Sequence, residues 1–97
     1  MRIIWSPLAV ERISEIAEYI SQNNLDASTK WVDDIFTKIE QLNNFPESGR
    51  IVPEMNRNNI RELIYKNYRI VYRIESEQIS ILTVRHFKQI MPLEEIS

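Results

Sequence analysis

Two segments in the first half of the chain repeat apolar residues at the spacing of an amphipathic helix. In the first, over about residues 7–23, the apolar positions follow an i, i+3, i+4, i+7 pattern and comprise Ile13, Ile16, Ala17 and Ile20. After the polar pair Asn23-Asn24, Asp26 can cap a second helix, whose apolar positions are Val32, Ile35, Phe36, Ile39 and Leu42. We therefore predict a helical hairpin over about residues 7–43, with the second stripe in the core.

The other apolar segments have the composition of β-strands. Residues 1–5 are mostly β-branched or aromatic and end at Ser6 and Pro7, which can cap and begin the first helix. Residues 43–59 contain the only glycine and two prolines, which predicts an irregular connection. Residues 59–65, 68–75 and 78–87 are rich in Ile, Val, Tyr and Thr, with two-residue turn candidates between them. The order β-α-α-β-β-β predicts an α+β fold in which the hairpin covers one face of a small, mainly antiparallel sheet.

Composition limits the chemistry that this chain can carry. Its 97 residues, 43% hydrophobic and 27% charged, indicate one globular domain over residues 1–97. The absence of cysteine excludes disulfides, thiolate nucleophiles and zinc sites with sulfur ligands, and a single histidine argues against a metal cage. Phosphate-binding and dinucleotide-binding glycine motifs are also missing, so we expect no metal and no cofactor. Because Glu11 follows the apolar start so closely, we expect no signal sequence, no membrane partner and a cytoplasmic location.

The net charge of −2 conceals an uneven distribution of charge along the chain. Residues 1–48 hold four basic and eight acidic side chains, whereas residues 49–88 hold eight basic and four acidic ones. Six of the eight basic side chains in residues 49–88 are arginines, whose planar guanidinium suits phosphate and carboxylate groups. The basic sheet half, about 59–87, is therefore the candidate binding half, and a short tail follows over 88–97. The acidic total argues against a protein that coats nucleic acid.

Alternation along the strands assigns candidate side chains to the two faces of the sheet. With two-residue turns in both hairpins, one face carries Arg69, Val71, Arg73, Leu82, Val84 and His86. If the helices cover the face of Tyr68 and Ile70, the open face presents arginines and a histidine. Arginine can stabilise the negative charge that develops when a phosphodiester is cleaved, histidine can protonate the leaving oxygen, and Glu54 could supply the base. Arg61 falls on the opposite face in this register. The alternative explanation of these charged residues is that they form ion pairs on a solvent-exposed face of the sheet, and that His86 is a hydrogen-bonded structural residue.

Several segments resemble the RelE/ParE superfamily of type II toxin–antitoxin toxins. They are WSPLAVERISEIAEYI (5–20), FPESGRIVPE (45–54), IRELIYKNYRIVYRI (60–74) and ISILTVRHFKQ (79–89), so the match spans nearly the whole chain. The resemblance implies a small sheet curled against a helical hairpin. It also implies a toxin that forms a hetero-oligomer with a cognate antitoxin, whose extended and partly disordered segment wraps the toxin.

The superfamily contains two mechanisms. RelE-like members are metal-independent ribonucleases that cleave mRNA on the ribosome. The resemblance would then assign Glu54 as base, Arg61 and Arg69 as phosphate clamps, and His86 or its neighbour as acid. ParE-like members are not enzymes in this sense, because they bind and poison DNA gyrase. The ParE-like branch is favoured here, since the chain is acidic and Phe87, which follows His86, cannot transfer a proton. A third alternative is a non-toxic remnant that only binds the antitoxin.

The resemblance also suggests where an antitoxin would bind. We expect an antitoxin helix against the apolar seam beside the second helix, and acidic antitoxin residues near the arginines of the sheet. The candidate contacts are Trp31, Arg61, Arg69 and Arg73. The antitoxin family and the stoichiometry of the complex do not follow from the sequence.

Overall fold

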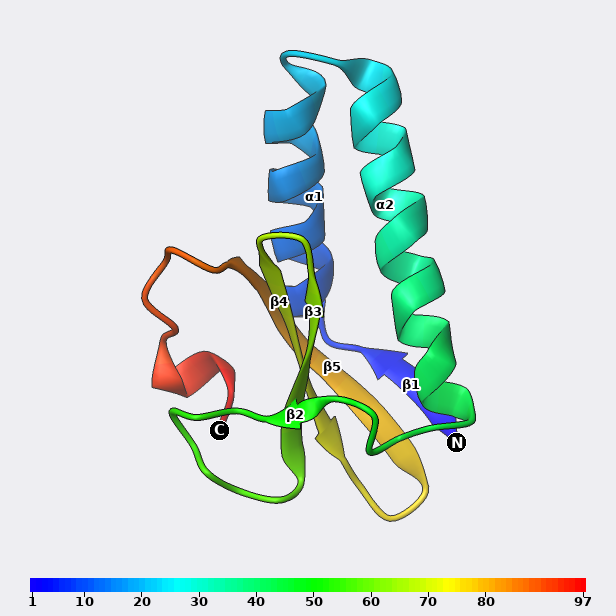
Figure 1. The fold of residues 1–97 in the computed structure, drawn as a ribbon, viewed down its shortest axis with the longest axis vertical. Helices are drawn as coiled ribbons and strands as arrows, with labels where there is room; N and C mark the ends of the chain where they lie inside the picture. Colours follow the sequence, from blue (N-terminus) through cyan, green and yellow to red (C-terminus); the bar gives the residue numbers. More distant parts are fainter.

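The computed structural model describes residues 1–97 as two helices packed on one five-stranded sheet (Figure 1). Its helices are α1 (Pro7–Ser21) and α2 (Leu25–Glu40), with short 3-10 helices η1 (Gln41–Asn43) and η2 (Leu93–Glu95). Its strands are β1 (Arg2–Trp5), β2 (Arg50–Ile51), β3 (Ile60–Tyr65), β4 (Tyr68–Ile74) and β5 (Gln78–His86), in the spatial order β1-β5-β4-β3-β2. β1 runs parallel to β5, and the other pairs are antiparallel. The predicted α+β fold is confirmed, and only the short β2 falls in a region expected to be irregular.

Side-chain caps set the start of both helices. The Ala9 amide donates to the Ser6 hydroxyl oxygen at 3.0 Å, so Ser6 caps α1 as predicted. At α2 the cap is Asn24, which accepts from the Ala27 amide at 3.0 Å, and the prediction of Asp26 was wrong. Asn24 has extended backbone angles, which an N-cap requires, whereas Asp26 lies inside the first turn, where a carboxylate favours the helix dipole.

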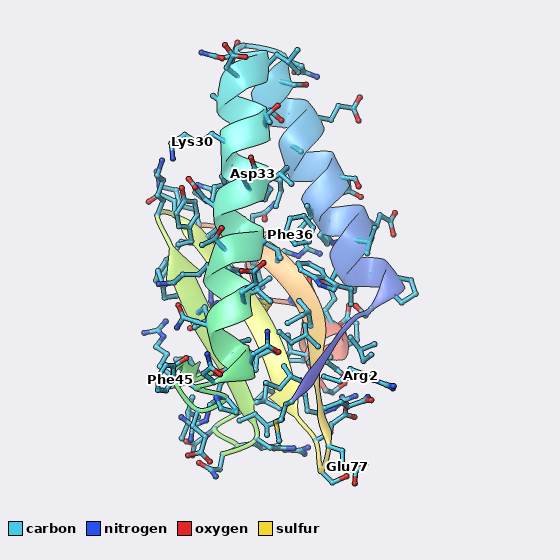
Figure 2. The ribbon with its side chains drawn as sticks, turned by 90° about the vertical axis from the view of Figure 1, so that its right-hand side faces the viewer. Arg2, Lys30, Asp33, Phe36, Phe45 and Glu77 are labelled. Carbon is cyan, nitrogen blue, oxygen red and sulfur yellow. The ribbon has the colours of Figure 1, made fainter.

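The main core lies between the helical hairpin and one face of the sheet. Tyr72 and Val84 are fully buried there, with the other buried members Ala9, Ile13, Trp31, Ile35, Ile39, Leu42, Leu63, Ile70, Ile79 and Ile81. Phe36 does not belong to this core, against expectation. It stays 45% exposed, on the side of α2 that faces α1 (Figure 2). Its ring packs on Trp5 with the centroids 5.0 Å apart. No helix combines the length and the apolar character needed to cross a membrane.

The opposite face of the sheet is covered as well, although the sequence predicted it to be open. A smaller apolar cluster forms there from Val52, Ile60, Val71, Leu82, Met91 and Ile96. Met91 and Ile96 belong to the C-terminal tail, which holds the short 3-10 helix η2. In Figure 1 this tail, in orange and red, folds back beside the sheet toward the connection that precedes β3. The tail and the β2–β3 connection thus act as a second, thin layer.

A β-bulge in β5 changes which side chains share a face. Both predicted turns hold, since Ile64 pairs with Arg69 and Arg73 pairs with Ser80. The register then shifts between Val71 and Tyr72, so that Arg69 pairs with Arg85 and Tyr68 pairs with His86. The expected common face of Arg69 and His86 is therefore wrong. The physical reason is the extra residue of the bulge, which reverses the facing of everything beyond it. For the same reason Val84 lies in the main core and not beside Arg69.

Candidate functional site

Arg69 lies at the centre of a buried ion network on the tail-covered face of the sheet. Its side chain is only 7% exposed. Its Nε donates to Glu62 Oε1 at 2.6 Å, while Nη1 and Nη2 donate to the two oxygens of Glu54 at 2.8 and 2.7 Å. Such a two-pronged pair is among the strongest contacts that a guanidinium makes. The fork of Arg69 is thus fully engaged by carboxylates of its own chain.

Glu62 extends this network to the surface. It projects from β3 with a side chain that is 0% exposed, and its second oxygen accepts from Arg50 Nε at 2.6 Å. The result is an alternating row of four charges: Arg50, Glu62, Arg69 and Glu54. Because a charge in a protein interior must be paired to be tolerated, each inner member of the row depends on its neighbours.

The network controls the proton affinity of Glu54. Hydrogen bonds from Arg69 lower the pKa of this carboxyl from 4.5 to about 2, against the opposing effect of burial. The same contact with Glu54 raises the pKa of Arg69. A general base works best when its pKa lies near the working pH. Glu54 is therefore a carboxylate at neutral pH and a weak proton acceptor.

A hollow opens over this network where the tail leaves β5. It is lined by Arg50, Pro53, Glu54, Arg69, Phe87, Gln89, Ile90 and Met91. The ring of Phe87 lies over the guanidinium of Arg69, with 6.0 Å between the guanidinium carbon and the ring centroid. Phe87 and Ile90 remain 50% and 90% exposed. The hollow therefore combines a charged floor with an apolar rim.

The structure places the other predicted arginines away from this hollow. Arg61 pairs with Tyr72, so its side chain starts from the face of the sheet opposite that of Arg69. Its Nη1 donates to the carbonyls of Gly49 at 3.0 Å and Glu47 at 3.3 Å. Arg73 donates to the carbonyl of Ser97 at 3.1 Å and contacts Glu75 at 3.4 Å. Arg61 and Arg73 are thus engaged with other parts of their own chain.

His86 and Trp31 lie on the helix side of the sheet. The Lys88 amide donates to His86 Nδ1 at 3.1 Å, and the His86 ring meets Tyr68 edge-on with the centroids 5.2 Å apart. Trp31 is only 5% exposed and packs on the same Tyr68 from inside the core, so it offers no contact surface. Of the four candidate catalytic residues, the structure brings together only Glu54 and Arg69.

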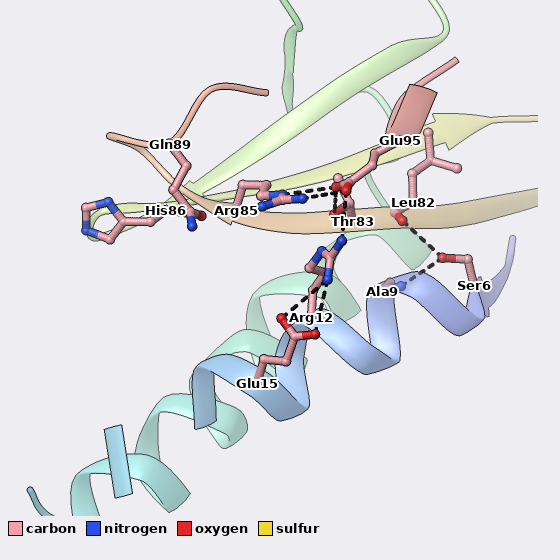
Figure 3. Close-up of polar contacts among 10 residues, drawn as sticks. All are labelled: Ser6, Ala9, Arg12, Glu15, Leu82, Thr83, Arg85, His86, Gln89 and Glu95. Carbon is pink, nitrogen blue, oxygen red and sulfur yellow. Dashed lines mark hydrogen bonds and ion pairs between the residues drawn. The ribbon is translucent and has the colours of Figure 1, made fainter. Parts of the chain in front are cut away.

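A second ion network ties the tail to the rest of the molecule (Figure 3). Glu95 accepts from Arg12 Nη2 at 2.9 Å and from the Thr83 hydroxyl at 2.9 Å, and it also pairs with Arg85. These contacts, led by the hydrogen bond from Arg85, lower the pKa of Glu95 to about 2. The carboxylate thus joins the tail to both α1 and β5.

Sequence reasoning missed Arg50 and Glu62. The signal for Glu62 was present, because a carboxylate stands between apolar residues in a segment that otherwise reads as a buried strand. Arg50 gave no comparable signal. It belongs to a segment expected to be irregular, and only the fold brings it to Glu62, its partner across β2 and β3.

An apolar groove lies between α1 and α2. It is lined by Trp5, Val10, Ile13, Ser14, Ala17, Val32 and Phe36. Val10 and Phe36 are 51% and 45% exposed, so the groove continues the core to the surface beside the second helix. This is the apolar seam that the sequence predicted at that position.

Comparison with known proteins identifies the family. A model of the family described as "ParE toxin of type II toxin-antitoxin system, parDE" matches residues 3–91. A protein of Sinorhizobium fredii described as "Putative toxin Y4kP" is 39% identical over 93 residues, which cover 94% of this chain and 93% of that protein. A solved structure described as "Chromosomal ParDE TA system from P. aeruginosa" has the same fold, with a TM-score of 0.75 at 20% identity, over 91% of this chain and 97% of that one. The chain therefore belongs to the ParE toxin family of type II toxin–antitoxin systems.

Proposed function

We propose that this chain arrests growth by binding and poisoning DNA gyrase, and that a cognate antitoxin neutralises it. We propose a cytoplasmic location for the toxin. Membership of the ParE family supports the proposal. The observation that carries it is the separation of the residues that RNA cleavage would need.

RNA cleavage by an attacking 2′-hydroxyl requires a base, a phosphate clamp and an acid around one phosphate. In this chain the carboxylate of Glu54 is held by Arg69 and has a pKa of about 2. The N–H donors of Arg69 that would face a phosphate already bind carboxylates. His86 projects from the other face of the sheet, beside Tyr68. This arrangement supports action by binding.

The groove along the helical hairpin supports the antitoxin part of the proposal. Its lining is mostly apolar, and its members Val10 and Phe36 are partly exposed. Helices with one apolar face dock into such grooves through residues spaced at i, i+3, i+4 and i+7. We propose that an antitoxin helix lies here, and that replacing Phe36 with aspartate weakens the complex without unfolding the toxin.

A DNA supercoiling assay with purified gyrase tests the main proposal. We expect the toxin to inhibit supercoiling, with cleaved DNA accumulating, and the antitoxin to restore activity. A parallel incubation with ribosomes and mRNA serves as the second arm. No inhibition of gyrase at excess toxin, together with cleaved mRNA that an Arg69→Ala variant fails to produce, would replace this proposal with the ribonuclease one. No effect in either arm would indicate a non-toxic remnant.

A further inference from the structure

Arg50 differs from Arg61, Arg69 and Arg73, the arginines that the sequence proposed as contacts. Only its Nε has a hydrogen-bond partner, Glu62, and its side chain is 51% exposed. Both terminal nitrogens of its guanidinium are free. By contrast, Arg69 has all three nitrogens bound, and Arg61 and Arg73 donate to backbone carbonyls. The free fork of Arg50 borders the hollow above the ion network.

The ion network fixes this fork in one position. Glu62 holds Arg50 Nε at 2.6 Å, Arg69 holds Glu62 at the same distance, and Glu54 holds Arg69 from the other side. The backbone before Arg50 is also fixed, because the Gly49 amide donates to the Tyr72 hydroxyl at 2.9 Å. A buried ion pair is weak as a source of stability compared with apolar residues of the same size. Its effect here is to pre-organise a donor at the surface, which reduces the entropy lost on binding.

The surroundings of the fork indicate what it binds. Phe87 and Ile90 form an exposed apolar rim on the same hollow. Arginine and aromatic side chains are enriched at protein–protein interfaces relative to the rest of the surface. The carboxylates of Glu54 and Glu62 neutralise the positive charges of Arg69 and Arg50 at the hollow, and the chain as a whole is acidic. A polyanionic nucleic acid is therefore a poor match, whereas one carboxylate next to an apolar side chain is a good one.

We propose that Arg50 receives a carboxylate of an acidic antitoxin segment through its two free terminal nitrogens. A neighbouring apolar side chain of that segment packs on Phe87 and Ile90. The inference rests on the proposed antitoxin partnership and changes its details, because the sequence placed the acidic contact at Arg61, Arg69 or Arg73. It makes Arg69 and Glu62 positioning residues, which act through Arg50 and do not touch the partner.

Titration calorimetry with the purified cognate antitoxin tests this site. We expect Arg50→Ala to raise the dissociation constant at least about tenfold, because it removes a hydrogen-bonded charge pair that becomes desolvated in the complex. Arg50→Lys is expected to recover only part of the affinity, since lysine keeps the charge but lacks the fork. The matched control is Arg57→Ala, which removes the same charge from an exposed side chain without hydrogen-bond partners and is expected to change the constant less than about twofold. Thermal unfolding of each variant confirms that it is folded.

Three outcomes would overturn the inference in distinguishable ways. If Arg50→Ala binds the antitoxin as tightly as the unaltered toxin does, the site is wrong while the antitoxin proposal stands. If the unaltered toxin does not bind the antitoxin, the proposed function fails and the site loses its partner. If Arg50→Ala leaves antitoxin binding intact but weakens binding of a single-stranded oligonucleotide, Arg50 is a phosphate contact.

Discussion

Replacing Arg69 with alanine is expected to destabilise the protein by about 3–5 kcal/mol, because it breaks a buried ion pair by removing one partner. Three hydrogen bonds are lost, one to Glu62 and two to Glu54. Glu54 can turn to water, since its side chain is 35% exposed. Glu62 cannot reach water, since its side chain is 0% exposed, and Arg50 would be its one remaining ion-pair partner. The expected loss is a large part of the total stability of a small domain, about 5–15 kcal/mol.

Urea unfolding followed by circular dichroism measures this loss. The free energy of unfolding of Arg69→Ala should fall by the amount given above, whereas that of the control Arg57→Ala should stay within about 0.5 kcal/mol of the value for the unaltered protein. A second variant isolates the cause. Replacing the pair together, as Arg69→Met with Glu62→Leu, removes the stranded charge and should recover most of the stability. A loss below about 1 kcal/mol in Arg69→Ala, or a double variant weaker than the single one, would refute the reasoning.

Three further perturbations test other parts of the structure. Glu95 has a pKa of about 2 in the folded protein, below its ordinary 4.5, so its contribution to the free energy of unfolding is present above pH 4.5 and is lost as the pH falls toward 2. Glu95→Gln should therefore flatten the dependence of the free energy of unfolding on pH in this range, and an unchanged slope would contradict this. Gly49→Ala should lower the melting temperature by several degrees, because the added carbon would lie 2.6 Å from both the Glu62 carbonyl oxygen and the Tyr72 hydroxyl; an unchanged melting temperature would show that the segment can shift freely. Tyr72→Phe removes the hydroxyl that the Gly49 amide donates to and that itself donates to the Pro46 carbonyl; we expect a loss of about 1–3 kcal/mol and faster hydrogen exchange at the Gly49 amide, and unchanged exchange there would count against the contact.

Most of the fold follows from local patterns in the sequence. The apolar stripes predicted both helices, Ser6 and Pro7 predicted the start of α1, and the two tight turns set the pairing of Ile64 with Arg69 and of Arg73 with Ser80. These features depend on residues that are close in the chain, where periodicity, capping and turn chemistry act directly.

The candidate site depends on contacts that such patterns do not contain. The bulge in β5 adds one residue to a regular alternation, and this alone moves His86 to the face opposite Arg69. The tail covers a face that the sequence left open, because Met91 and Ile96 find their neighbours only after the sheet has formed. Arg50 joins the network through a two-residue strand too short to predict. The family resemblance identified the class of protein, but its candidate residues did not include the arginine with a free fork.

The parallel pairing of β1 with β5 has a consequence for how the toxin is made. Arg2 lies beside Gln78, a partner 76 positions later in the chain, and the Ser6 hydroxyl that caps α1 donates to the carbonyl of Leu82. Contacts of such long sequence separation slow folding, because a large loop must close before they form. The first strand can therefore join the sheet only after β5 has been synthesised. The members of the ion network around Arg69 all lie between residues 50 and 69, so that network does not depend on this pairing. The groove lined partly by Trp5 of β1 is complete only once β1 has joined the sheet.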